Sequence, residues 1–244
     1  MKKLLIVAIV LVVSSAAYAG QATHWGYSGA EGPEHWGKLD PGFTACSEGK
    51  NQSPINLTGF IESDLKPIDI HYDAGGKEII NNGHSVQVNY TAGSKISVDG
   101  HEFELKQYHF HAPSENHLKG QSYPMEAHLV HADAKGNLAV IAVMFVEGKA
   151  NQSIAIAWSH MPGKAGDKKS LSPGILAEGI LPSNRDYYRF NGSLTTPPCS
   201  EGVWWLVMKE PVTASKDQIE KFVQVMQHPN NRPIQALNAR SVLK

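Results

Sequence analysis

The chain of 244 residues has little cysteine, little net charge and no long apolar run, and each shortage excludes a class of protein. Two cysteines are too few for the disulfide framework of a small secreted domain or for a four-cysteine zinc site. The 22 Lys and Arg nearly balance 23 Asp and Glu, which argues against nucleic acid or a membrane surface as a partner. The most apolar run, residues 4–13, is too short to span a bilayer.

That apolar run belongs to a predicted export signal. Lys2 and Lys3 precede it, and small residues at Ala17 and Ala19 follow it, as in a secretory signal peptide. We therefore predict a signal peptide over residues 1–19, followed by one domain over residues 20–244 that is exported to a bacterial periplasm. A domain of this length can bury one core without dividing.

The two cysteines are Cys46 and Cys199. In an exported protein an even pair is typical of a disulfide. Zinc binding by the pair is disfavoured, because neither cysteine has a Cys or His close to it in the sequence. We therefore predict a disulfide between them.

Short runs rich in β-branched and aromatic residues recur along the chain between turn signals. Residues 138–145, LAVIAVMF, are apolar at every position and predict a strand in the middle of a sheet. Residues 215–227 predict a helix, with a capping box at Ser215 and Gln218 and an apolar face of Ile219, Phe222, Val223 and Met226. The fold class expected is mainly β (α+β), with about ten strands in a large, mostly antiparallel twisted central sheet and a few short peripheral helices.

The stretch 107-QYHFHAPSENH-117 contains half of a metal site. Side chains alternate along a strand, so His109 and His111 share one face. A second run, 125-MEAHLVH-131, offers His128 on one face and His131 on the other. Three neutral imidazoles with an open fourth position are typical of catalytic zinc. Alternation alone does not choose between His128 and His131, and His101 and His117 are also near in sequence.

These stretches resemble the α-class carbonic anhydrases over nearly all of residues 20–244. The resemblance rests on blocks that follow one another in the family's order: 24-HWGYSGAEGPEHW-36, 51-NQSPINL-57, 81-NNGHSVQV-88, 107-QYHFHAPSENH-117, 125-MEAHLVH-131, 192-GSLTTPPCSEGVWW-205 and 232-RPIQALNAR-240. It implies that zinc is held by His109, His111 and His128, with His131 outside the ligand set.

The resemblance also implies an activity, the reversible hydration of carbon dioxide to bicarbonate and a proton. A zinc ion with three neutral ligands lowers the pKa of bound water to about 7, so zinc hydroxide is the expected nucleophile. Weak cleavage of activated esters is an expected side reaction. Exported bacterial relatives are often dimeric, so a homodimer is an open expectation.

The resemblance assigns further roles residue by residue. Thr195 orients the hydroxide and donates its own hydrogen to Glu115, and His84 shuttles the product proton to solvent. The expected acceptors behind the zinc ligands are Gln107 for His109, Glu126 for His128 and a backbone carbonyl for His111. The expected carbon dioxide pocket comprises Val130, Val140, Leu194, Thr196 and Trp205, and the expected polar cavity wall comprises Tyr27, Asn82 and Gln87.

Two positions depart from the commonest vertebrate pattern: Asn116 stands where His is usual, and Phe190 where Tyr is usual. A disulfide at Cys199 is expected to tether the loop that carries Thr195, and the family suggests a cis peptide at residues 197–198.

Two rival functions remain. A binding protein that has lost activity would lack a ligand, Thr195 or Glu115, and all are present. A serine hydrolase is poorly supported, because 26-GYSGA-30 lacks the last glycine of G-x-S-x-G.

Overall fold

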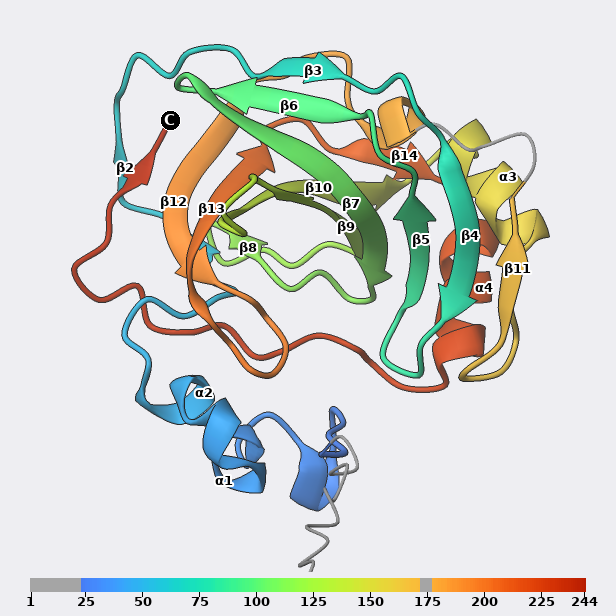
Figure 1. Ribbon diagram of the computed structural model, residues 1–244, viewed down its shortest axis with the longest axis horizontal. Coiled ribbons are helices and arrows are strands. Elements are labelled where there is room, and N and C mark those ends of the chain that lie inside the picture. Colours follow the sequence, from blue (N-terminus) through green and yellow to red (C-terminus); the bar gives the residue numbers. More distant parts are fainter. Residues whose placement is uncertain (1–22, 172–176) are drawn as a thin grey trace, which may run out of the picture.

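The computed structural model describes residues 23–171 and 177–244 (Figure 1). The signal peptide predicted over residues 1–19 lies outside the described residues. Within them, no helix is both long enough and apolar enough to cross a membrane.

One large twisted sheet organises the described part of the chain (Figure 1). Its thirteen strands run in the order β11-β4-β5-β7-β9-β10-β13-β12-β15-β2, with β6 on β7, β3 on β6 and β14 on β10. The strands of this sheet are β2 (Phe60–Ile61), β3 (Asp69–His71), β4 (Gly76–Asn81), β5 (Val86–Tyr90), β6 (Lys95–Val98), β7 (His101–His111), β9 (Met125–Ala132), β10 (Leu138–Glu147), β11 (Lys168–Ser170), β12 (Tyr187–Ser193), β13 (Glu201–Met208), β14 (Val212–Ala214) and β15 (Val242–Leu243).

The predicted fold class is confirmed. Most neighbouring strands pair antiparallel, while β10 runs parallel to β13 and β14, and β15 runs parallel to β2. The strand β10 lies between β9 and β13, as its apolar sequence predicts. The strands beyond the expected ten are pieces of two or three residues, such as β2 and β15, which are too short to show alternation. A separate pair joins β1 (Asn56–Leu57) to β8 (His117–Leu118).

Within the described residues, four helices lie around the sheet. They are α1 (Trp36–Leu39), α2 (Ala45–Glu48), α3 (Gln152–Ser159) and α4 (Lys216–Met226), with 3-10 turns at Gly29–Glu31, Pro41–Phe43 and Ala177–Ile180. Figure 1 shows α3 and α4 together beside the β4–β5 end of the sheet, and α1 and α2 at a separate edge.

The helix α4 has the predicted capping box, because the Ser215 hydroxyl accepts from the Gln218 backbone and the Gln218 side chain accepts from the Ser215 backbone. The apolar face predicted for it is partly wrong. Phe222 and Met226 are buried, whereas Val223 is 45% exposed. The buried stripe continues through Gln218, four residues before Phe222, and Val223 lies beside it.

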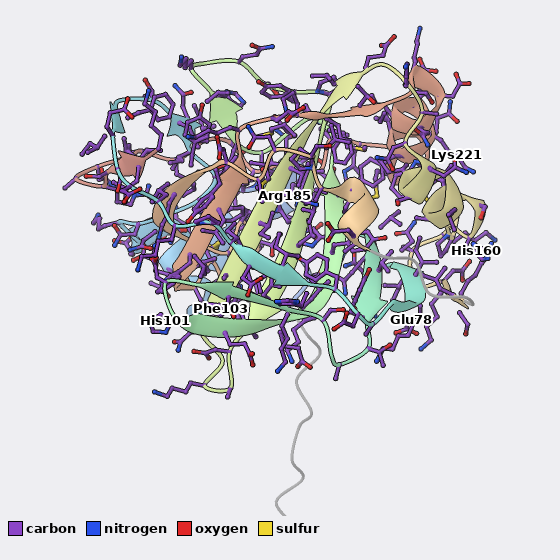
Figure 2. All side chains as sticks on the ribbon, turned by 90° about the horizontal axis from the view of Figure 1, so that it is seen from above. Glu78, His101, Phe103, His160, Arg185 and Lys221 are labelled. Carbon is purple, nitrogen blue, oxygen red and sulfur yellow. A yellow bond between two sulfur atoms is a disulfide. The ribbon has the colours of Figure 1, made fainter. Side chains whose placement is uncertain are left out.

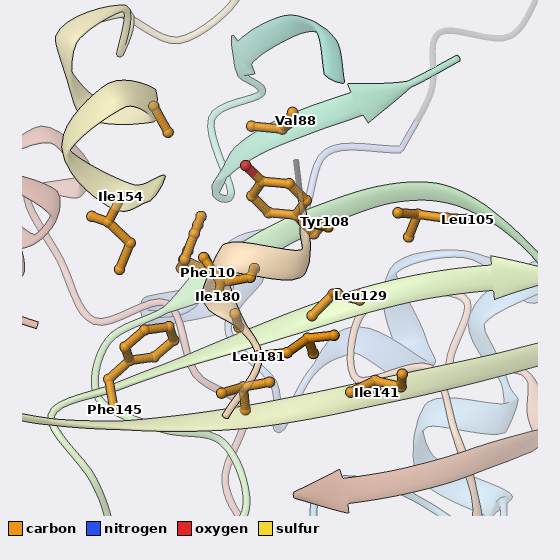
Figure 3. Close-up of a cluster of buried hydrophobic side chains, with 14 of the residues drawn as sticks. Val88, Leu105, Tyr108, Phe110, Leu129, Ile141, Phe145, Ile154, Ile180 and Leu181 are labelled. Atoms are coloured by element: carbon orange, nitrogen blue, oxygen red, sulfur yellow. The ribbon is translucent and has the colours of Figure 1, made fainter. Parts of the chain in front are cut away.

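Apolar side chains cover both faces of the central strands. On one face, β7, β9 and β10 contribute to a core that also receives α3 and α4; Figure 3 labels its members Val88, Leu105, Tyr108, Phe110, Leu129, Ile141, Phe145, Ile154, Ile180 and Leu181. On the other face, Val140, Ala142, Trp205 and Phe190 form a second cluster. Burial of β9 and β10 on both faces makes them rigid supports for any polar group placed among these side chains.

Strand register positions the histidines. Antiparallel pairing places His109 of β7 opposite His128 of β9, and His111 opposite Glu126. Side chains directly opposite each other share a face of the sheet. The pairing therefore gathers His109, His111 and His128 on one face, while Tyr108, Phe110 and Leu129 enter the core on the other.

Candidate metal centre

The three histidines form a group whose ligand atoms lie within 4.8 Å of one another, and it is the one such group found among residues 23–171 and 177–244. The ring centroids of His109 and His111 are 5.0 Å apart, and those of His111 and His128 are 4.6 Å apart. The rings meet at steep angles, so their nitrogens point to a common region instead of stacking.

Each ring uses one nitrogen for a hydrogen bond and leaves the other for the centre. The acceptors are the Gln107 side-chain oxygen for His109 Nδ1, at 2.8 Å, and the Glu126 carboxylate for His128 Nε2, at 2.9 Å. His111 Nδ1 lies 2.6 Å from the Asn230 backbone oxygen. Metal-binding histidines have this arrangement, in which the outer hydrogen bond fixes the ring and its tautomer.

The chemistry of this donor set fits a zinc ion. His111 Nε2 is buried and has no hydrogen-bond partner within the described part of the chain. Burial, the largest cause, lowers the pKa of His109, His111 and His128, so all three rings are neutral at neutral pH. Neutral imidazole is the form that binds metals, and three such nitrogens suit zinc.

Glu115 faces the same centre. Its Oε1 accepts from the Arg232 backbone N–H at 2.8 Å, and its Oε2 lies 3.5 Å from His111 Nε2 and 3.8 Å from His128 Nδ1. Burial raises the pKa of Glu115 to about 8. The buried Thr195 hydroxyl is close enough to lower that pKa, although Glu115 Oε2 makes no hydrogen bond of standard geometry with any described residue.

His84 and the predicted polar wall line one cavity of about 120 Å³. Its lining includes Tyr27, Asn82, His84, Gln87, His109 and Thr196. The His84 ring stacks on Trp25, with centroids 3.7 Å apart and planes 8° apart. Burial, followed by the charges of His24 and His228, lowers the pKa of His84.

Four of the five residues predicted for the carbon dioxide pocket lie together in one apolar cluster. Val140 pairs with Val130 across β9 and β10 and with Trp205 across β10 and β13. These residues and Leu194 pack in the second apolar cluster, and the Trp205 ring lies 4.8 Å from that of His128. Thr196 is in contact with the cavity instead of this cluster.

The two positions that depart from the vertebrate pattern have different surroundings, one polar and one apolar. Asn116 donates to Glu126 from both its backbone and its side chain, at 2.8 Å each, and accepts from the Ile55 N–H at 3.1 Å. Phe190 stacks on Trp205 with planes 5° apart. The Asn116 amide therefore supports Glu126 without a hydroxyl at position 190.

The predicted disulfide is present between Cys46 and Cys199, and the Pro197–Pro198 peptide is cis. The bridge attaches α2 to the segment that follows Thr195 and Thr196. Gln52 adds to this attachment, because its side chain donates to the Cys199 carbonyl at 3.0 Å.

The other candidate histidines lie elsewhere. His131 is buried on the opposite face of β9, where Nε2 lies 2.8 Å from the Tyr72 hydroxyl. His101 begins β7 and lies beside Phe103 (Figure 2). Its ring also packs against Trp204. His117 belongs to the short strand β8.

The sequence did not reveal three residues that contact the predicted site: Trp25, Asn230 and Arg232. Trp25 and Arg232 lie within the quoted family blocks, but no motif marked their contacts. Asn230 contacts His111 through its backbone carbonyl, an atom that every residue has. Only the fold shows which carbonyl reaches the ring.

The fold and this centre define a class of protein: a β-sheet protein with a buried site of three neutral histidines. The sequence profile of the eukaryotic-type carbonic anhydrases matches residues 31–244. A carbonic anhydrase of Pectobacterium carotovorum is 47% identical over 243 residues, which cover 100% of both chains.

Solved structures agree. The α-carbonic anhydrase of Thermovibrio ammonificans, in complex with sulfanilamide, has a TM-score of 0.90 and 50% identity, covering 92% of this chain and 100% of that one. The Photobacterium profundum α-carbonic anhydrase has a TM-score of 0.86 and 50% identity, covering 91% and 100%. The chain belongs to the eukaryotic-type, or α-class, carbonic anhydrase family, and its enzymatic class is carbonate dehydratase.

Proposed function

We propose that the protein hydrates carbon dioxide reversibly at a zinc ion bound by His109, His111 and His128. The observation that carries the proposal is the set of three neutral ring nitrogens within 4.8 Å of one another, each on a ring fixed by an outer hydrogen bond. Zinc, when bound, supplies Lewis-acid chemistry that makes water nucleophilic at neutral pH.

Thr195 and Glu115 orient the nucleophile. A carboxylate only accepts hydrogen bonds, so an ionised Glu115 obliges the Thr195 hydroxyl to donate to it and to accept from the attacking group. Positive charge at the centre favours this ionised form against the burial that raises the Glu115 pKa. The Arg232 N–H holds the other carboxylate oxygen in place.

Carbon dioxide is uncharged and donates no hydrogen bond, so an apolar surface suits it. Val130, Val140, Leu194 and Trp205 supply that surface next to His128, and Thr196 lies at its polar side. The product bicarbonate leaves through the cavity lined by Tyr27, Asn82 and Gln87.

His84 carries the product proton from the centre to solvent. It lines the same cavity as His109 and His111, and it is half-buried, so it contacts both the interior and the mouth. An imidazole suits this task because its ordinary pKa lies near that of the group it must deprotonate. Export to the periplasm, with residues 20–244 as one domain, completes the proposal, and a disulfide suits that compartment.

Stopped-flow hydration of carbon dioxide tests the proposal. The protein is assayed as purified, after removal of metal with a chelator, and after addition of zinc, with metal content measured at each stage. We expect one zinc per chain, loss of hydration on removal and recovery on addition. Hydration that persists in metal-free protein would show that the centre is not catalytic, and cleavage of an activated ester on the same samples reports the side activity.

A further inference from the structure

Asn230 is a buried residue that contacts two parts of the proposed machinery. It lies four residues after the end of α4 at Met226, beyond the left-handed residue Gln227, and it is 0% exposed. Each polar atom of its side chain is hydrogen-bonded within the described part of the chain. Breaking any hydrogen bond of a buried, fully paired amide leaves a polar group unsatisfied, which is unfavourable. The groups that Asn230 bonds are therefore the ones that it holds in place.

One group of bonds fixes the metal side. The Asn230 backbone oxygen accepts from His111 Nδ1 at 2.6 Å, and its side-chain oxygen accepts from the Ala112 N–H at 2.9 Å. These contacts hold the end of β7 immediately after the ligand His111. The ring contact uses the main chain, so it does not depend on the side chain at position 230.

The side-chain nitrogen makes the other group of bonds. Asn230 Nδ2 donates to the backbone carbonyl of His84 and to that of Phe110, at 2.9 Å each. Phe110 stands between His109 and His111 on β7. One amide group therefore joins the turn that carries His84 directly to the strand that carries two of the ligands.

Other bonds shape the turn locally. The Asn82 side-chain oxygen accepts from the N–H groups of His84 and Ser85, at 2.9 and 2.8 Å. The Ser85 hydroxyl donates to the Phe110 carbonyl at 2.6 Å. Ser85 thus anchors the turn after His84, and Asn230 anchors the carbonyl of His84 itself.

We propose that Asn230 is a positioning residue that sets the His84 ring at a working distance from the metal centre. The proposal rests on the proposed function, in which His84 transfers the product proton. Proton transfer requires near hydrogen-bonding geometry, directly or through water, and a displacement of about 1 Å can cost about 100-fold in rate. A turn released at its His84 carbonyl allows such a displacement.

The test is Asn230→Asp, which keeps the shape and the acceptor for the Ala112 N–H but replaces the two donor hydrogens with an oxygen. That oxygen repels the carbonyls of His84 and Phe110. We expect kcat in weak buffer to fall about tenfold. This is less than the full contribution of general acid–base catalysis, because His84 is displaced and not removed. We expect kcat/KM and zinc content to stay within about twofold, because the main-chain contact to His111 is kept. Added imidazole should restore kcat.

Asn81→Asp is the matched control. It makes the same amide-to-carboxylate change at another buried residue, which lies next to the turn that carries His84. The Asn81 side-chain oxygen accepts from the Gly83 N–H at 3.0 Å. That acceptor survives the substitution, so kcat in weak buffer should stay within about twofold of wild type. If Asn230→Asp does not fold, the uncharged Asn230→Ser, which also lacks the amide donors, takes its place with the same expected split.

A second readout does not depend on turnover. The His84 ring stacks on Trp25, so its proton resonances carry the ring-current shift of the indole. In zinc-loaded Asn230→Asp these resonances should move toward their unstacked positions, while in Asn81→Asp they should not. Unchanged resonances together with an unchanged kcat would overturn the proposal.

Equal losses of kcat, kcat/KM and zinc would also overturn it, because they indicate a general structural role for Asn230. His84→Ala separates this proposal from the one on which it rests. If His84→Ala leaves kcat in weak buffer unchanged, the proton-shuttle role is wrong, and the resonance shift alone then decides whether Asn230 positions the ring. If His84→Ala lowers kcat and Asn230→Asp does not, only the role of Asn230 is refuted.

Discussion

Two histidines of β9, His128 and His131, point to opposite faces of the sheet. His128 points to the face that carries the proposed metal centre, and His131 points into the apolar core on the other face. His128 has one ring nitrogen on the Glu126 carboxylate and the other directed at the proposed centre. His131 has one nitrogen 2.8 Å from the Tyr72 hydroxyl and the other 3.3 Å from the Ala139 carbonyl. Both rings are buried.

The comparison shows that burial alone does not distinguish a ligand from a structural histidine. Burial lowers the pKa of both rings, so both are neutral at neutral pH. They differ in what remains after hydrogen bonding: His131 has both nitrogens occupied, whereas His128 has one left for a cation. A neutral ring with an unused nitrogen beside two others is suited to bind a metal, and a fully bonded ring is suited to the core.

The largest expected effect comes from making the same substitution, histidine to glutamine, separately at each of the two positions. His128→Gln should weaken zinc binding by more than about 100-fold, beyond what loss of an outer contact costs, and hydration should fall with it. His131→Gln should keep one zinc per chain but lower the free energy of unfolding by about 1–3 kcal/mol, because buried groups lose partners. Metal content, turnover and urea unfolding measure the contrast.

The comparison fails if His131→Gln loses zinc as readily as His128→Gln does. It also fails if His128→Gln keeps both zinc and activity. His71, whose side chain is 64% exposed on β3, offers a surface control, since His71→Gln should change neither metal content nor stability by more than about 0.5 kcal/mol.

The next effect concerns a residue proposed to orient the nucleophile without binding the metal. Thr195→Ala should keep the zinc and the fold but lower hydration about 100-fold, because the nucleophile loses the group that orients it. Thr195→Ser keeps the hydroxyl and should recover most of the activity. Turnover near wild type in Thr195→Ala, with zinc bound, would refute the orienting role.

Much of the fold could be predicted because its central strands have regular patterns. The alternation around His109 and His111 predicted one face for both rings, and the apolar run of β10 predicted its central place. The short strands β2, β3, β11, β14 and β15 have two or three residues, too few for a pattern to stand out. Their pairing depends on neighbours that are distant in the sequence.

The ligand set could be predicted only in part from the residues. Alternation offered His128 and His131 equally, and family resemblance was needed to choose between them. The deciding contacts come from Tyr72 and Ala139, which no local pattern connects with His131. Asn230 was out of reach for the same reason, because its partners His84 and Phe110 are more than a hundred residues away in the sequence.

The smallest expected effect is a difference in acid sensitivity between wild type and His131→Gln. Burial lowers the pKa of His131 to about 3, whereas an unfolded histidine titrates near 6.5. Below pH 6.5 the unfolded chain therefore binds a proton that the folded chain refuses, and stability falls by up to about 1.4 kcal/mol per pH unit from this group. Above pH 6.5 the contribution is constant.

His131→Gln lacks this titrating group, so its stability deficit relative to wild type should shrink as the pH falls from 7.5 to 5. Urea unfolding of the two metal-free proteins measures that deficit. Parallel profiles over that range would mean that His131 titrates alike in both states and is not held neutral by the core.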